Sequence, residues 1–292
     1  MSDPHAARIL RETLPGALAL TVTGRPGPPP LRMEMTDGRR LLLRQGGRVL
    51  LLGRVDPDRG GVALRLGPGH RSPLPPLSAD ASRRGPDWRH RYAGLLGDAA
   101  EGPLHDGRWL LAERPTLPYG AWRHELARTW PEAYLDWNAG WNGVVPLRPL
   151  SAPDAPRVKA YRRRAREGVL PPVLLWWVSA FDGWVILDGH DRAVAALAED
   201  REPESVVLTR GEDEEEQREV LDRVVAWHER LLAGLGDDPA KEPQRRWAVE
   251  ALARTAAGLP YDRKRTAAWP VPGGAAEWDA LMLEFRHEHD RS

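Results

Sequence analysis

The first part of the chain alternates short apolar runs with clusters of glycine, proline and aspartate. The apolar runs are LALTVT, LRMEM, RLLLR, RVLLLGRV and VALRL, and the clusters between them are GRPGPPP, TDG, QGG and DPDRGG. Runs of this length, bounded by turn residues, are typical of β-strands. We therefore expect five short strands over residues 17 to 66, with RLLLRQGGRVLLLGRV forming a β-hairpin.

A different pattern begins near residue 143. GVVPLRPL reads as a short strand, and APRVKAYRRRAREG reads as a helix because Pro156 suits a first turn and Gly168 a C-terminal stop. VLPPVLLWWV, GWVILD and ESVVLTR are further strand-like runs, and DRAVAALAED has the apolar spacing of a helix. The order strand, helix, strand, strand, helix, strand predicts a compact α/β unit.

The last 80 residues have helical periodicity. The acidic run EDEEEQRE opens a segment in which apolar residues recur at helical spacing: Leu221, Val224, Trp227, Leu231 and Leu235. Two more amphipathic helices are expected around Trp247 and Trp278. We expect a helical region here.

These patterns divide the chain into four regions. They are an N-terminal β-rich region (1–86), a Trp-rich connecting region (87–142), an α/β core (143–211) and a C-terminal helical region (212–292). The expected fold class is α+β. The connecting region holds six of the thirteen tryptophans. Such residues can stack on bases or line a groove, but filling the core is the favoured interpretation.

Composition limits the classes of function. The chain has 42 basic and 42 acidic residues and no cysteine. Zero net charge gives no general attraction to nucleic acid or to an anionic membrane, and the missing thiols exclude disulfides, thiolate metal sites and thiol nucleophiles. Neither a signal peptide nor an apolar run long enough to span a membrane is found, so we expect a cytoplasmic protein without a membrane partner.

The α/β core resembles the ParB/sulfiredoxin superfamily. PLRPL, a helix, EGVLPPVLLW, then GWVILDGHDRAVAALAED and ESVVL are similar in order to that core, in which a segment of the type e-x-G-x-x-x-P-i-x-v precedes y-x-i-x-D-G-H-x-R-x-x-A. The resemblance covers residues 143 to 210. It implies a nucleotide-phosphate loop at Asp188, Gly189, His190 and Arg192.

Physical chemistry gives each of these residues a role. Gly189 lets the backbone approach an anion at a helix N-terminus, Arg192 can grip phosphate oxygens, and His190 can donate a hydrogen bond or shuttle a proton. Asp188 or Asp191 can act as a base, and Asp191 can hold Mg²⁺. The expected ligand is a nucleotide, either ATP, ADP or CTP, and the expected activity is that of a phosphotransferase or nucleotide hydrolase.

The chain also departs from the superfamily. Sulfiredoxins place a catalytic cysteine where this chain has His190, so their chemistry is excluded. Chromosome-partitioning ParB proteins have a second basic residue at the position of Asp191, and a carboxylate there repels a triphosphate unless Mg²⁺ lies between them.

Three alternatives remain open. The turn can be purely structural, with Asp188 as an N-cap, Asp191 complementing the helix dipole and Arg192 in an ion pair. The fold can serve as a non-catalytic protein-interaction module, with a protein partner on the C-terminal helices. DNA binding through the basic segment RVKAYRRRAR is disfavoured, because no recognition helix follows.

Overall fold

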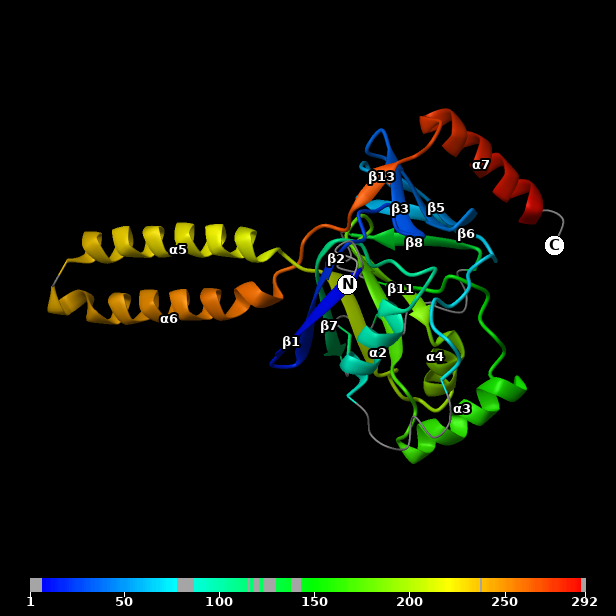
Figure 1. Cartoon of the computed structure of the whole chain (residues 1–292), viewed down its shortest axis with the longest axis horizontal. Helices are drawn as coiled ribbons and strands as arrows, with labels where there is room; N and C mark the ends of the chain where they lie inside the picture. The colour runs from blue at the N-terminus through cyan, green and yellow to red at the C-terminus, as the bar shows by residue number, and fades with distance from the viewer. Residues whose placement is uncertain are drawn as a thin grey trace, which may run out of the picture.

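The computed structural model is an α+β fold with two mixed sheets and, in the part of the chain that it describes, six α-helices (Figure 1). The described residues are 7–77, 87–114, 116–117, 121–122, 130–137, 143–236 and 238–289. The expected fold class is confirmed.

The first sheet has seven strands in the order β1-β2-β7-β12-β10-β11-β9. Their bounds are β1 Arg8–Leu14, β2 Ala17–Thr23, β7 Gly107–Arg114, β12 Ser205–Arg210, β10 Val173–Val178, β11 Gly183–Asp188 and β9 Val144–Val145. The pairs β10/β12 and β9/β11 are parallel, and the other neighbours are antiparallel. Helices α2 (Trp88–Gly97) and α4 (His190–Leu197) pack against this sheet, and α3 (Pro156–Glu167) packs against α4.

The second sheet has six strands in the order β13-β3-β4-β5-β6-β8. Their bounds are β13 Ala268–Pro270, β3 Leu31–Thr36, β4 Arg40–Gln45, β5 Arg48–Asp56, β6 Gly61–Leu66 and β8 Glu132–Asp136. Helix α7 (Gly274–His289) covers this sheet by placing Trp278 and Phe285 against Leu42 and Leu52. A single apolar cluster joins residues of both sheets, including Leu18, Leu41 and Trp176, so the two sheets share one core.

The sheets cut across the four regions expected from the sequence. Strands β1 and β2 come from the N-terminal region but extend the sheet of the α/β core through β7. Strand β8 comes from the Trp-rich region and pairs with β6. In that region Trp109 and Trp122 are buried, and Trp88, Trp130 and Trp137 pack against the shared core; Trp141 lies outside the described residues. Core filling is therefore confirmed for the five described tryptophans.

The predicted C-terminal helices are present, but only two of them leave the body. Helices α5 (Glu214–Leu235) and α6 (Glu242–Gly258) form an antiparallel hairpin, called the arm here, that projects away from both sheets (Figure 1). The chain then returns, and β13 pairs with β3 before α7 begins. No helix among the described residues combines the length and apolarity needed to cross a membrane.

Candidate functional site

The segment DGHDR forms the predicted strand-to-helix turn. Strand β11 ends at Asp188, Gly189 occupies the bend with φ of 101°, and α4 begins at His190, which places Arg192 in the first helical turn. A positive φ of this size favours glycine. A Cβ at this position would also lie 2.7 Å from Nη2 of Arg192, so the bend requires glycine for two reasons.

The Arg192 guanidinium is buried inside the protein. Its Nη2 donates to Asp188 Oδ2 at 2.8 Å, to the Pro172 carbonyl at 3.0 Å and to the Tyr92 hydroxyl at 3.2 Å. Burial opposes the charge, but Tyr92 and Asp188 raise the pKa of Arg192, so it stays a cation. Arg192 therefore joins α4 to the end of β11, to the loop before β10 and to α2, and this nitrogen is already engaged.

His190 is also buried, and its Nε2 accepts a hydrogen bond from the Leu147 backbone N–H at 3.1 Å. A ring nitrogen that accepts carries no proton, so this contact places the proton of the neutral ring on Nδ1. Burial, and then the neighbouring His70, hold the pKa of His190 well below its ordinary value. In this position a neutral His190 anchors the loop that contains Leu147.

His70 lies beside His190, with 5.2 Å between the ring centroids. Burial, and then the charge of Arg148, lower the pKa of His70 to about 4. Its buried Nε2 has no hydrogen-bond partner within the described part of the chain. An unsatisfied buried polar atom next to a cleft is a candidate contact for a ligand.

Asp191 is held by the residues that precede and begin α3. Its Oδ1 accepts from Arg148 Nη2 and from Ser151 Oγ, each at 2.8 Å, and its Oδ2 lies 3.4 Å from Arg157 Nε. Burial alone would raise the pKa of Asp191, but the hydrogen bonds from Ser151 and Arg148 lower it. The carboxylate predicted as a metal ligand is thus ionised and occupied by two arginines.

Asp188 is likewise engaged on both oxygens, because Oδ1 accepts from Ser72 Oγ at 2.8 Å while Oδ2 binds Arg192. Among the described residues, no three histidine, aspartate or glutamate side chains gather in a way that could hold a metal ion.

These side chains line one cleft of about 290 Å³. All five residues of DGHDR contribute to it, together with His70, Ser72, Arg148, Arg157 and Tyr161. The sequence prediction missed His70 and Ser72, which follow the last strand expected in the N-terminal β-rich region. Arg148 could have been suspected, because it belongs to PLRPL in the segment that carries the superfamily resemblance.

Searches against family models, curated proteins and solved structures find no match to this chain. The ParB/sulfiredoxin resemblance therefore remains an expectation from the sequence.

Proposed function

We propose that the chain binds a phosphate-bearing small molecule, of the nucleotide class, in the cleft at the start of α4, on a ParB-like core. The elements β9, α3, β10, β11, α4 and β12 follow one another in the order expected from the resemblance. A volume of about 290 Å³ is near the lower limit for small-molecule sites, which suits a phosphate group with the nucleoside extending outward. Tyr161 lines the same cleft and offers an aromatic surface to a base.

The observation that carries this proposal is the uncapped start of α4 at the cleft. Gly189 has no side chain, and among the residues that the structure describes no side chain caps this end of the helix. The first N–H groups of a helix have no acceptor within it, and the helix dipole favours an anion at this position. Gly189, His190, Asp191 and Arg192 all line the cleft, so a phosphate there can accept from backbone N–H groups.

Two arginines supply the complementary charge. Arg148 and Arg157 line the cleft, and Asp191 holds Arg148 by a hydrogen bond and lies close to Arg157. The side chain of Arg157 is 66% exposed, so most of it is open to a ligand. We assign the phosphate contacts to Arg148, Arg157 and the helix N-terminus, and we assign Arg192 to holding the turn together.

Binding is supported better than catalysis by the residues of the DGHDR turn. Asp188, His190 and Asp191, the predicted catalytic groups, each already make hydrogen bonds within the protein. DNA binding has less support. Of the basic residues in RVKAYRRRAR, Arg157, Arg162, Arg163 and Arg166 all lie in ion pairs.

Thermal denaturation with ATP, ADP, CTP and GTP, each with Mg²⁺ and with a chelator, tests the proposal. A ligand at 100 times its Kd stabilises the folded state by about 2.7 kcal/mol, which shifts the Tm measurably. We expect at least one nucleotide to raise the Tm of the native chain and to lose this effect in Arg157→Ala.

Arg163→Ala is the matched control, because Arg163 lies on the same helix, has a side chain that is 69% exposed and does not line the cleft. The control should respond like the native chain. If no nucleotide and no inorganic phosphate shifts the Tm, the proposal is wrong. An equal response in Arg157→Ala would show that binding occurs elsewhere.

A further inference from the structure

The arm presents an apolar face that the described part of the chain covers only in part. Trp227 on α5 and Trp247 on α6 are 53% and 59% exposed, and they are among the most exposed large apolar residues of the described chain. Beside them, a shallow groove of about 420 Å³ is lined by Leu231, Leu235, Pro243, Gln244 and Trp247. An exposed patch of this kind usually marks an interaction site.

Helical spacing places these residues on one side of the arm. Val220, Val224, Trp227, Leu231 and Leu235 follow the i, i+4, i+7 rhythm along α5. The residues half a turn away on α5 are charged: Arg218, Asp222 and Glu229. Helix α5 therefore has one apolar side and one charged side. Within the described residues of the arm only His228 and Ala248 are fully buried. Val220, Val224, Leu231 and Leu235 are half-buried while Trp227 and Trp247 are exposed, so the contact between α5 and α6 covers the apolar face only in part.

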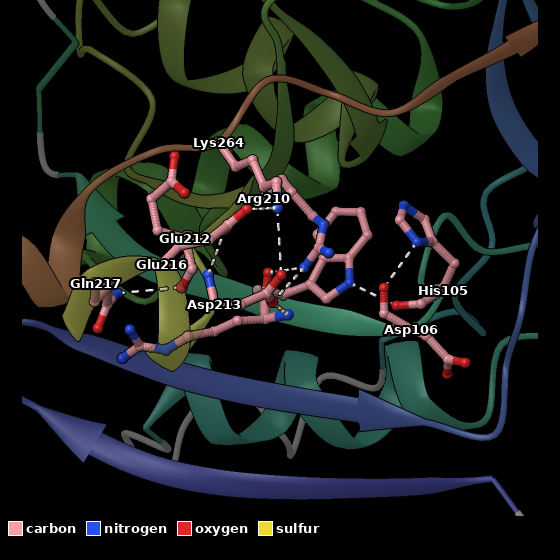
Figure 2. Close-up of polar contacts among 10 residues, drawn as sticks. His105, Asp106, Arg210, Glu212, Asp213, Glu216, Gln217 and Lys264 are labelled. Atoms are coloured by element: carbon pink, nitrogen blue, oxygen red, sulfur yellow. Dashed lines mark hydrogen bonds and ion pairs between the residues drawn. The ribbon is translucent and has the colours of Figure 1, made fainter. Parts of the chain in front are cut away.

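A polar cluster at the root of α5 fixes the arm to the body (Figure 2). The carboxylate of Asp213 caps α5 and accepts from the Arg108 backbone N–H at 3.1 Å, while Lys264 pairs with both Asp213 and Glu216. The ion pair with Lys264 lowers the pKa of Glu216 to about 2. The root is held to β7 and to the segment before β13, and the arm extends away from them (Figure 1).

We propose that the apolar face of the arm packs against the arm of a second copy of this chain, so that two hairpins form a four-helix bundle. Two antiparallel helices are half of such a bundle, and the same face on each copy suits a two-fold axis. This inference concerns the arm alone and is independent of ligand binding at the cleft.

The size of the face fits this partner. A helix of 17 residues, the length of α6, is about 25 Å long, and two helices side by side are about 20 to 24 Å wide. The face therefore covers about 500 to 600 Å² on each copy, and about 1,000 to 1,200 Å² in the pair, which reaches the lower range of specific interfaces.

The charges along its edges also favour a second copy. Arg223 pairs with Glu219 at 3.8 Å on α5, and Arg254 pairs with Glu250 at 4.0 Å on α6. Each edge thus carries both signs. A rim of one sign would select a partner of the opposite charge, whereas mixed rims can exchange ion pairs across a two-fold axis.

Sedimentation equilibrium of the full chain tests the proposal at about 1 to 100 µM, a range that detects micromolar dimers. We expect the native chain to have twice the monomer mass at the upper concentrations. Trp227→Glu and Trp247→Glu should each reduce the measured mass to that of the monomer, because dimerisation would bury a carboxylate in the bundle. Circular dichroism checks that both variants stay folded.

The matched control is Val249→Glu. Val249 is 52% exposed on α6, but it lies two residues from Trp247 and so on the opposite side of the helix. The Val249→Glu variant should remain dimeric. A native chain that stays monomeric at about 100 µM would overturn the proposal and leave the face to another protein. Equal dissociation in Val249→Glu would show that the dimer uses a different surface.

Cysteine cross-linking locates the contact, because the native chain has no cysteine. Gln244→Cys places a thiol in the groove, and Ala253→Cys places one on the opposite side of α6. A flexible bismaleimide should join two chains of the first variant much more efficiently than two chains of the second. Equal yields from the two variants would contradict pairing through the apolar face.

Discussion

Arg192 and Asp188 form an ion pair across the bend at Gly189, with 2.8 Å between Nη2 and Oδ2. The side chain of Arg192 is 4% exposed, so removal of Asp188 would leave a buried cation without its counter-charge. We expect Asp188→Ala to lower the free energy of unfolding by about 3 kcal/mol. Urea denaturation of the native chain and the variant measures this loss in the free energy of unfolding.

Glu199→Ala provides the comparison for Asp188→Ala. Glu199 also pairs with two arginines, Arg162 and Arg166, but their side chains are 32% and 56% exposed. Such surface pairs contribute about 1 kcal/mol or less. If the two variants lose equal stability, the Arg192–Asp188 pair does not hold the turn.

A second prediction compares two glycines with positive φ. Gly189 has φ of 101° and packs against the Arg192 guanidinium, whereas Gly168 has φ of 69° and no atom of the described residues within 4 Å of a Cβ built there. Alanine at Gly168 should cost about 1 kcal/mol for the left-handed backbone alone. Alanine at Gly189 should cost at least about 2 kcal/mol more, because Arg192 must also move. Chemical denaturation of the two variants gives the difference. Similar losses would mean that the guanidinium shifts without cost.

The histidine pair predicts how stability depends on pH. Burial lowers the pKa of His70 to about 4, while an unfolded histidine titrates near 6.5. Between these values the unfolded chain binds more protons than the folded chain. Stability therefore falls as the pH is lowered from about 6.5 to 4, by up to about 3 kcal/mol from this residue.

His70→Gln removes this titration. The variant should lose less stability than the native chain over the same pH interval, as measured by urea unfolding at several pH values. If the free energy of unfolding depends on pH in the same way in both proteins, His70 is protonated without penalty in the folded state.

The root of the arm gives another prediction. Asp213 caps α5 and binds the Arg108 backbone, so Asp213→Ala should increase hydrogen exchange in the first turns of α5. Asp238→Ala is the control, because the Asp238 carboxylate accepts from the Ala240 N–H at 2.9 Å in the turn between the two helices, at the far end of α5 from the root. Exchange at the root should stay unchanged in the control. Unchanged exchange at the root of Asp213→Ala would mean that Lys264 and Glu216 suffice to hold it.

Much of the local structure was predictable because it depends on neighbouring residues. The turn at Gly189 follows from an apolar run, a glycine and a helical spacing that are contiguous in the chain. The hairpin of β4 and β5 is equally local, with QGG between two apolar runs. Strand β1 was missed because RILRETL lacks alternation, and in the structure both of its faces are largely exposed.

The rest depends on contacts between distant parts of the chain. No local pattern shows that Ala17 pairs with Ala112, so the division into regions did not foresee a sheet shared between them. For the same reason His70 could not be connected with His190, from which it is 120 residues distant in sequence. The motif alone could not predict two of the partners of Arg192 and Asp191, because Tyr92 and Arg148 lie outside it.

The last prediction concerns the sign of the effect at Asp191. As a carboxylate in a phosphate site it should oppose binding, yet it holds Arg148 and lies 3.4 Å from Arg157. If positioning of the arginines dominates, Asp191→Asn should weaken nucleotide binding although it removes a negative charge. Hydrogen bonds to charged groups contribute about 1.5 to 3 kcal/mol, so the expected loss of affinity is about tenfold or more.

Calorimetric titration of the native chain and Asp191→Asn, with Mg²⁺ and with a chelator, separates the possible roles of this carboxylate. Weaker binding by the variant in both buffers supports the positioning role, because that role needs no metal. Tighter binding by the variant in chelator would show that Asp191 repels the phosphate. Weaker binding in Mg²⁺ alone would assign the carboxylate to a metal ion that arrives with the nucleotide. Arg148 and Arg157 would then have to turn away from Asp191 when the ligand binds, because both of its oxygens face them in the structure.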